Sequence, residues 1–249
     1  MSGRREPSSP SVDAVFDAYA EDYEETLQRG VRLSGEDSSF FAEGRVAWVG
    51  RRLAELGIRA ETLLDFGCGT GATTGLLLAL PAAKHVLGTD VSTGLLEVAR
   101  REHGSEQVEF VPLTEPPENR IDLAYCNGVF HHIPPGERRG AVEYVWRALR
   151  PGGLFALWEN NPWNPGTRLV MRRIPFDRDA IPLSAPEARK LLTAYRFDVL
   201  RTDFLFVFPR FLAPLRRAEP ALSSLPLGAQ YLVLARKPDV AEPNGNSAP

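Results

Sequence analysis

The chain has 249 residues, 43% of them hydrophobic, and a formal net charge of −3 at pH 7. This length fits one α/β domain, alone or with an inserted lid, and allows a sizeable core. The weakly acidic balance argues against a surface that binds nucleic acid, because proteins that bind it usually carry a strong basic excess. No apolar run approaches the ~18 residues of a membrane span, and the amino terminus lacks the apolar stretch of a signal peptide. The two cysteines, Cys68 and Cys126, have no metal-ligand spacing, so we expect a cytoplasmic protein.

The two ends of the chain differ in composition from its middle. Residues 1–11 and 239–249 are rich in Pro, Ser, Gly and Asn, which predicts disordered tails. Residues 12–57 show helical periodicity in two stretches, separated by a loop over Gly30 to Ser39, and form the predicted helical cap. Residues 58–238 form the predicted core, in which strands alternate with helices as far as residue 159. That alternation is the pattern of a doubly wound parallel sheet.

Residues 63–71 are the most informative segment of the core. They read Leu-Leu-Asp-Phe-Gly-Cys-Gly-Thr-Gly, an apolar strand that runs directly into three glycines. Gly67, Gly69 and Gly71 let the backbone turn sharply and approach a ligand closely. The apolar run from Ala72 to Leu80 predicts a helix whose first amides face the bound group. The segment therefore predicts a cradle for a nucleotide-type ligand.

Two kinds of site compete for this segment. Gly67-x-Gly69-x-x-Ala72 satisfies the loose fingerprint of a dinucleotide site, but such a match is weak by itself. Asp65 lies just before the turn, where an acid is out of place beside a pyrophosphate but suits a ligand with an ammonium and a sulfonium. Residues 65–71 resemble motif I of the class I S-adenosylmethionine-dependent methyltransferases. We therefore favour that cofactor over a nicotinamide or a flavin.

The resemblance continues along the chain. Residues 85–90 predict a strand that ends in Asp90, which is placed to accept both ribose hydroxyls, and Val91 follows where the family lays the adenine. Residues 128–134, Gly-Val-Phe-His-His-Ile-Pro, follow a predicted strand over residues 121–127. They are similar to the ubiquinone/menaquinone C-methyltransferase-like branch of the class.

Further motifs extend the resemblance over about residues 15–160. Pro151-Gly152-Gly153 is similar to the family's turn before strand five, and residues 16–23 resemble the helix that caps the cofactor. One departure concerns the adenine. After strand three the family often has an acid that binds the adenine amine, whereas Leu113 and Thr114 stand here.

The resemblance implies a fold and a cofactor site. The fold is a seven-stranded, mostly parallel, Rossmann-like sheet that finishes with an antiparallel sixth and seventh strand, over residues 197–208 and 230–237. Asn127 is either a cofactor contact or a turn residue, and Tyr19 and Tyr23 are either helix-packing aromatics or a wall over the methyl group. The candidate residues for S-adenosylmethionine are Asp65, Gly67, Cys68, Gly69, Gly71, Asp90, Val91, Asn127, Tyr19 and Tyr23.

Three residues are candidates for catalysis. His131 and His132 invite a general-base assignment because histidine titrates near neutrality, but in this motif the pair begins a helix and one ring usually packs inward. Glu159 lies at the carboxyl end of the fifth strand, where open α/β sheets place their ligands. With Asn160 and Asn161 it could orient an acceptor hydroxyl or amine.

Residues 160–195 and 209–226 are longer than plain connections and form the predicted substrate lid. The candidate acceptor-binding residues are Asn160, Asn161, Trp163, Arg168 and Arg172. Arg168 and Arg172 share one face of a predicted helix, which is either solvated or grips an anionic acceptor. No paired acids indicate a metal site, so we expect chemistry without a metal.

These patterns favour a methyltransferase that acts on a small molecule, as a monomer or a homodimer. A hydroxyl is the first choice of acceptor atom, with nitrogen and carbon as alternatives. All but three of the 29 basic residues are arginines, which suggests a GC-rich bacterial genome rather than a function. We expect a role in bacterial specialised, saccharide or lipid metabolism. The rival functions are an RNA or protein methyltransferase and a non-catalytic regulatory protein that binds the same cofactor.

Overall fold

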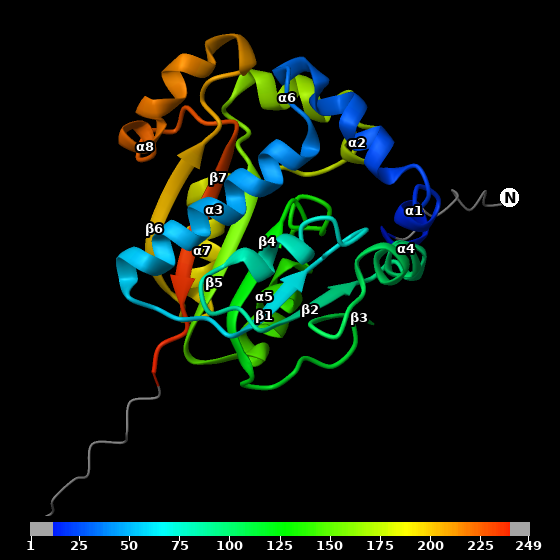
Figure 1. Ribbon diagram of the computed structural model, residues 1–249, viewed down its shortest axis with the longest axis vertical. Coiled ribbons are helices and arrows are strands. Elements are labelled where there is room, and N and C mark those ends of the chain that lie inside the picture. The colour runs from blue at the N-terminus through cyan, green and yellow to red at the C-terminus, as the bar shows by residue number, and fades with distance from the viewer. Residues whose placement is uncertain (1–11, 240–249) are drawn as a thin grey trace, which may run out of the picture.

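The computed structural model describes residues 12–239. The predicted tails therefore lie outside the described residues, except for Asp239. A single seven-stranded sheet crosses the molecule in the order β3-β2-β1-β4-β5-β7-β6 (Figure 1). Only β7 runs against the others, because it pairs antiparallel with both β5 and β6. The strands are β1 (Thr62–Phe66), β2 (His85–Asp90), β3 (Val108–Pro112), β4 (Ile121–Asn127), β5 (Leu149–Asn160), β6 (Asp198–Leu205) and β7 (Gln230–Arg236).

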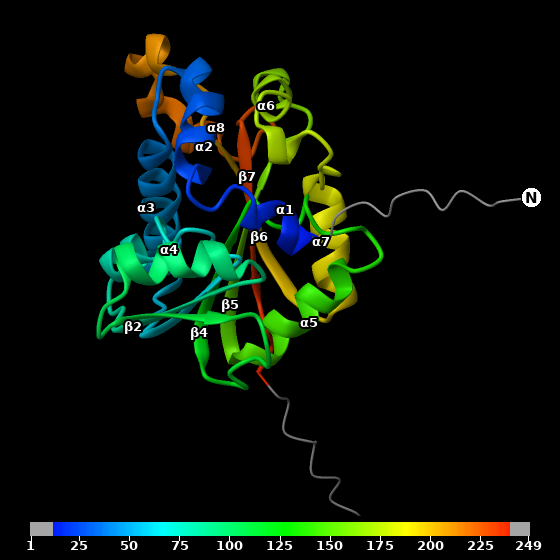
Figure 2. The same cartoon turned by 90° about the vertical axis from the view of Figure 1, so that its right-hand side faces the viewer.

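Helices cover both faces of the sheet (Figure 2). Successive side chains of a strand point to opposite faces, so apolar runs such as Leu63-Leu64 supply two cores. Leu63 packs with α3 (Ser38–Leu56) and α4 (Thr93–His103) on one face. Leu64 packs with α5 (Arg138–Ala148) and α7 (Ala185–Ala194) on the other. The predicted doubly wound α/β fold is confirmed.

Helix α3 is fixed at its ends and along its length. Asp37 accepts a hydrogen bond from the amide of Phe40 (2.9 Å) and caps the start, and Gly57, with φ of 64°, ends the helix. The indole of Trp48 and the guanidinium of Arg52 both donate to Asp203 of β6, at 2.9 and 2.7 Å. The amino-terminal cap is thereby tied to the far edge of the sheet.

Several shorter helices complete the molecule. The helices α2 and α6 lie together at the end of the molecule where β5 ends, the upper end of Figure 1. The part of the predicted lid that becomes α7 packs on the sheet through Ala185, Ala188 and Leu192. The shorter helices are α1 (Val12–Asp17), α2 (Tyr23–Val31), η1 (Arg32–Ser34), η2 (Gly75–Ala79), α6 (Pro165–Met171), η3 (Pro175–Asp177), η4 (Arg210–Ala218) and α8 (Glu219–Leu222).

The helix predicted over Ala72–Leu80 is wrong. This segment forms turns followed by the short 3-10 helix η2. The threonines at 73 and 74 and Gly75 are poor helix formers, and Pro81 disfavours a helical conformation at the residue before it.

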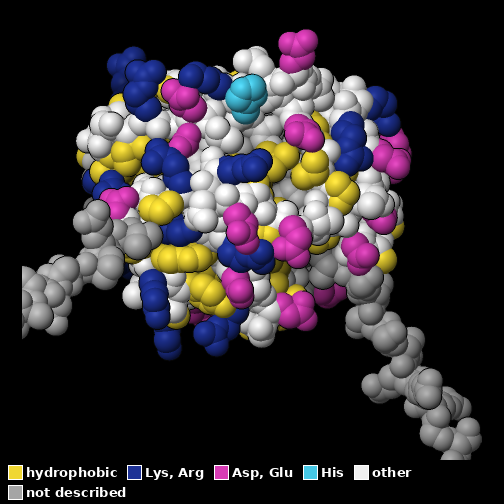
Figure 3. Space-filling view, turned by 90° about the horizontal axis from the view of Figure 1, so that it is seen from below, with side chains coloured by type: hydrophobic (Ala, Val, Ile, Leu, Met, Phe, Trp, Pro, Cys, Tyr) yellow, Lys and Arg dark blue, Asp and Glu magenta, His cyan; other side chains and the backbone are white. Residues whose placement is uncertain are grey.

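Charges of both signs are mixed on the face shown in Figure 3. Lys and Arg side chains lie among Asp and Glu side chains there, as the sequence's small net charge suggests. Within residues 12–239, no helix has the length and apolar character needed to cross a membrane.

Candidate cofactor and acceptor cavities

The glycine turn after β1 requires glycine for two separate reasons. Gly67, Gly69 and Gly71 all have left-handed backbones, with φ of 72°, 56° and 80°. A Cβ at Gly67 would also lie 2.3 Å from Cγ2 of Val129, and one at Gly71 would lie 2.6 Å from the ring of Phe110. Glycine is therefore required both for the left-handed backbone and because a side chain at Gly67 or Gly71 would clash with its neighbours.

Asp90 holds this turn in place. One carboxylate oxygen accepts from the amide of Gly69 and the other from the amide of Ser92, each at 2.9 Å. The amides of Gly67 and Cys68 donate to the carbonyl of Thr89, at 2.8 and 3.0 Å. Burial raises the pKa of Asp90, while the amide hydrogen bonds oppose that rise.

A cavity of about 520 Å³ opens over the turn, and we call it the glycine-turn cavity. Gly67, Gly69 and Asp90 line it at one end. Val91, with 46% of its surface exposed, contributes an apolar side chain to the wall of this cavity. Leu113 and Thr114, which replace the acid expected near an adenine, also line it.

A second cavity of about 430 Å³ lies beyond the carboxyl end of β5, and we call it the aromatic cavity. The helices α2, α3 and α6 and the segment 206–216 supply its walls. Its aromatic wall residues include Phe40, Phe41, Phe206, Phe208 and Phe211, and its polar wall residues include Arg45, Asn160, Gln230, His131, His132 and Asp177.

The two cavities meet at four residues that line both, Tyr23, Asn127, Gly128 and His132. The ring of Tyr23 stacks on Phe176, with centroids 4.9 Å apart, and burial raises its pKa. The side-chain oxygen of Asn127 is buried without a hydrogen-bond partner among the described residues. The two cavities are therefore neighbours that share these residues as walls.

Tyr19 lies near the junction without lining either cavity. Its ring packs edge-on against Phe176, with centroids 5.7 Å apart. Cys68 contributes its backbone to the turn, and its side chain packs beside Gly88.

Asp65 lies beneath the glycine turn and lines neither cavity. Only 2% of its surface is exposed, and it accepts a hydrogen bond of 2.6 Å from the hydroxyl of Thr74. Burial raises the pKa of Asp65 to about 7, and the charge of Asp90 adds to the rise. In this structure Asp65 stabilises the segment that follows the glycine turn through its hydrogen bond with Thr74.

The raised pKa of Asp65 predicts a pH-dependent gain in stability from Asp65→Asn. The proton is held more tightly in the folded state, so ionisation of Asp65 costs folding free energy increasingly from about pH 4 to pH 7, and fully above that. An asparagine cannot ionise but still accepts from Thr74. At pH 8, without ligand, the variant should gain about 1–4 kcal/mol in free energy of unfolding by urea, at about 1.4 kcal/mol per pKa unit, and less at pH 5.

The control for this prediction is Asp198→Asn, which removes an exposed carboxylate at the start of β6 and should not reproduce the gain. An equal stability difference between Asp65→Asn and the unmodified protein at pH 5 and pH 8 would show that Asp65 does not lose its proton in this range.

Glu159 does not reach the aromatic cavity. It is 1% exposed, and its carboxylate oxygens accept from the amide of Phe130 (2.7 Å) and pair with Nδ1 of His131 (2.6 Å). Neighbouring residues of a strand face opposite sides, so Asn160 lines the cavity and Glu159 does not. The prediction that Glu159 acts directly on the acceptor therefore lacks geometric support.

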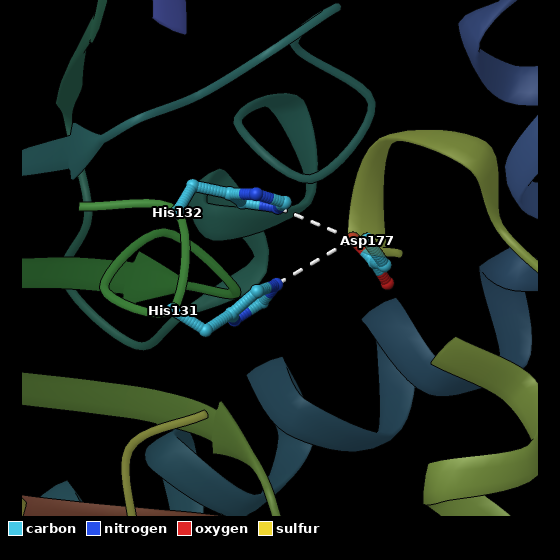
Figure 4. Close-up of side chains that lie close together, drawn as sticks. All are labelled: His131, His132 and Asp177. Carbon is cyan, nitrogen blue, oxygen red and sulfur yellow. Dashed lines mark ion pairs between the residues drawn. The ribbon is translucent and has the colours of Figure 1, made fainter. Parts of the chain in front are cut away.

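The histidine pair lies in a turn after β4, and not at the start of a helix as the resemblance implied. Nε2 of His132 lies 3.2 Å, and Nε2 of His131 3.5 Å, from the same carboxylate oxygen of Asp177 (Figure 4). Burial lowers the pKa of His132, and the charge of His131 lowers it further. Burial also opposes charge on His131, but Glu159 and Asp177 outweigh this and raise its pKa.

Of the predicted acceptor-binding residues, only Asn160 lines the aromatic cavity. Asn161 is buried in a turn, where its amide donates to the carbonyls of Pro226 (3.2 Å) and Gly228 (2.8 Å). Trp163, Arg168 and Arg172 are exposed and line neither cavity.

The structure brings Arg45, Asp177 and Gln230 into the aromatic cavity, and the sequence reasoning missed all three. Arg45 shares the buried face of α3 with Trp48, at a helical spacing of three. Arg45 and Arg52 both lie on this mostly apolar face, and arginines at such positions were a signal for buried charged groups. Asp177 and Gln230 carried no such signal, because only the tertiary fold brings them to the site.

Sequence comparison identifies the family. The family model described as "Methyltransferase domain" matches residues 64–155. A demethylmenaquinone methyltransferase of Clavibacter sepedonicus is 31% identical, in an alignment that covers 74% of this chain and 69% of that protein. The chain belongs to the class I S-adenosylmethionine-dependent methyltransferases. The predicted cofactor, S-adenosylmethionine, is confirmed with the family.

Other relatives match a smaller part of this methyltransferase. The trans-aconitate 2-methyltransferase of Methylobacterium nodulans is 34% identical over 53% of this chain and 52% of that protein. That of Azoarcus is 30% identical over 47% of this chain and 46% of that protein. The chain thus spans about half the length of these relatives.

Solved structures share the methyltransferase fold. A structure described as a possible histamine N-methyltransferase of Thermotoga maritima has a TM-score of 0.64 and 19% identity, and covers 91% of this chain and all of that one. The [4+2]-cyclase SpnF has a TM-score of 0.62 and 19% identity, over 94% of this chain and 98% of that one. Since the second is called a cyclase, the fold by itself does not specify methyl transfer.

The residues around the glycine-turn cavity fit S-adenosylmethionine. The left-handed glycines let the backbone approach a ligand closely without a Cβ in the way, and Asp90 supplies a carboxylate beside an apolar wall at Val91. The buried oxygen of Asn127 lacks the hydrogen-bond donor that an ammonium group would provide.

Proposed function

We propose that this chain transfers the methyl group of S-adenosylmethionine to a small, largely apolar acceptor that carries an anionic group. The observation that carries the proposal is the meeting of the two cavities at Tyr23, Asn127, Gly128 and His132. The cofactor occupies the glycine-turn cavity, with its methyl group at the junction. The acceptor occupies the aromatic cavity and presents its reacting atom there.

The cofactor contacts follow from the side chains that face the glycine-turn cavity. Asp90 accepts the ribose hydroxyls while it holds the glycine turn, and Val91 packs against the adenine. The side-chain oxygen of Asn127 accepts from the ammonium group, which satisfies its unpaired lone pairs. Tyr23 forms the wall over the methyl group, supported by its stacking on Phe176.

The anionic group of the acceptor is inferred from Arg45. This residue is 6% exposed and lines the aromatic cavity, and it donates to the hydroxyl of Tyr125 and the amide oxygen of Gln230, each at 3.0 Å. It forms no ion pair with any carboxylate in the part of the chain that is described. A buried guanidinium without an anionic partner is costly, and a carboxylate or phenolate on the acceptor would relieve that cost.

Methyl transfer from a sulfonium is an in-line displacement, so the protein contributes mainly positioning and exclusion of water. An acceptor oxygen that is already anionic needs no general base, which agrees with the enclosed position of Glu159. One relative is named for trans-aconitate, a carboxylate, and this supports an oxygen acceptor. Another is named for demethylmenaquinone, which keeps a carbon acceptor as the alternative. O-methylation remains our first choice because Arg45 suits an acidic acceptor, and a cavity of about 430 Å³ favours a small molecule over RNA or protein.

The proposal predicts that Arg45→Gln impairs use of the acceptor. With S-adenosylmethionine and a panel of trans-aconitate, other carboxylic acids, phenols and amines, the unmodified protein should form S-adenosylhomocysteine with an acidic acceptor. Arg45→Gln should raise the KM for that acceptor about 10- to 100-fold, equivalent to a charged hydrogen bond, while Arg45→Lys should retain part of the affinity. Mass spectrometry of S-adenosylhomocysteine formation measures both effects.

Arg168→Gln is the matched control, because Arg168 is exposed and lines neither cavity. An equal rise in KM for both arginine variants, or a preference for uncharged acceptors, would remove Arg45 from acceptor binding. Binding of S-adenosylmethionine without turnover on any acceptor would favour the regulatory alternative.

A further inference from the structure

Two histidines and an aspartate converge on one point at the wall of the aromatic cavity (Figure 4). His131 and His132 come from the turn after β4, and Asp177 comes from η3. One ligand atom from each lies within 4.8 Å of the others. The Nε2 atoms lie 3.5 and 3.2 Å from the same oxygen of Asp177.

One ring nitrogen of His131 makes no hydrogen bond with any described residue, although it lies 3.5 Å from a carboxylate oxygen of Asp177. His131 is 3% exposed, its Nε2 has no hydrogen-bond partner among the described residues, and this atom points at Asp177. The other ring nitrogen, Nδ1, lies 2.6 Å from Glu159 and donates to its carboxylate. A metal-ligating imidazole usually donates its other ring N–H to a carboxylate in this way, so the pairing with Glu159 suits a metal ligand.

The distances and the charges both suit a divalent ion. Ligands about 2.1 Å from a metal, at angles of 90° to 110°, lie about 3.0 to 3.5 Å from one another, which matches the distances from the oxygen of Asp177 to the two histidine nitrogens. Glu159 and Asp177 are both buried carboxylates. One proton shared with the histidines leaves this cluster with one negative charge, whereas a divalent cation balances both.

We propose that His131, His132 and Asp177 bind a divalent first-row transition metal ion such as Mn²⁺, Fe²⁺ or Zn²⁺, with Glu159 as the positioning residue for His131. Two imidazoles and one carboxylate form a set that these metals accept with open positions left over. Because the cluster lines the aromatic cavity, an open position faces the space for the acceptor. An acceptor oxygen could bind there, and this last step rests on the proposed function.

The test is metal binding by the full, untagged chain after treatment with EDTA. We expect one Mn²⁺ per chain by electron paramagnetic resonance and one Zn²⁺ by calorimetry, each with a Kd of about 10 μM or tighter. Pulsed resonance on the Mn²⁺ complex should show coupling to imidazole nitrogen. His131→Ala and Asp177→Asn should each weaken binding about 100-fold or more, and Glu159→Gln about 10- to 100-fold with one site retained.

The control is the double variant His85→Ala/His103→Ala, which removes the two other histidines of the chain and should bind metal normally. Absence of binding below about 1 mM, absence of nitrogen coupling, or a loss of affinity in the control would overturn the proposal. If a variant fails to fold, the nitrogen coupling in the unmodified protein still shows whether histidine binds the Mn²⁺ ion.

Turnover on the same preparations separates this proposal from the proposed function. A protein that methylates an acceptor but binds no metal contradicts only the metal site. A protein that binds the metal but forms no S-adenosylhomocysteine contradicts only the methyl transfer.

Discussion

Replacing Gly67 by alanine should abolish measurable cofactor binding. The φ of 72° costs a non-glycine residue about 1 kcal/mol or more, and the new Cβ would lie 2.3 Å from Cγ2 of Val129, a distance that atoms do not adopt. Either the turn or Val129 must move, and both line the glycine-turn cavity. We expect affinity for S-adenosylhomocysteine to fall more than 100-fold by calorimetry, together with a lower melting temperature.

Two further variants separate the clash from the backbone strain. Gly57 at the end of α3 also has a left-handed backbone, with φ of 64°, but a Cβ there meets no described atom within 4 Å. Gly57→Ala should therefore lose about 1 kcal/mol of stability and keep its cofactor affinity. Val129→Ala should restore part of the affinity lost in Gly67→Ala, and a double variant as weak as the single one would show that contact with Val129 is not the cause.

Asp90→Ala should cost the cofactor site about 1.5–3 kcal/mol, which is roughly a 10- to 150-fold loss in affinity. The substitution removes the proposed contact with the ribose, and it also frees the amides of Gly69 and Ser92 that the carboxylate holds at 2.9 Å. Titration with S-adenosylhomocysteine measures the loss, and Glu97→Ala, an exposed acid on the following helix, is the control. Unchanged affinity in Asp90→Ala would take Asp90 away from the ribose, and a preference for a nicotinamide cofactor would contradict the whole assignment of the cavity.

The strands and the cofactor turn could be predicted from sequence because their signals are local. The predicted strands 85–90 and 121–127 have the bounds observed for β2 and β4. Each of these signals, namely an apolar run, a glycine spacing and an acid at the end of a strand, can be recognised from residues that are close together in the sequence. The run Ala72–Leu80 was misjudged because apolar composition outweighed its poor helix formers.

The acceptor site could not be predicted in the same way. Glu159 was placed correctly at the end of β5, but the alternation of the strand turns it away from the cavity and toward His131. Arg168 and Arg172 satisfied a helical spacing, yet that spacing does not say which face of α6 meets the cavity. Arg45 and Gln230, which meet at 3.0 Å, lie far apart in the sequence, so no local pattern joins them.

The hydrogen bonds between Asp203 and α3 limit how this chain can exchange segments with its relatives. The segment matched by the family model, residues 64–155, contains the glycine turn and Asp90 but neither α3 nor β6. The helix that carries Arg45 is anchored by Trp48 and Arg52 to a strand near the other end of the chain. A chimera that imports new acceptor walls must therefore take α3 and β6 from the same parent, or a buried arginine and a buried aspartate will each lose their partner.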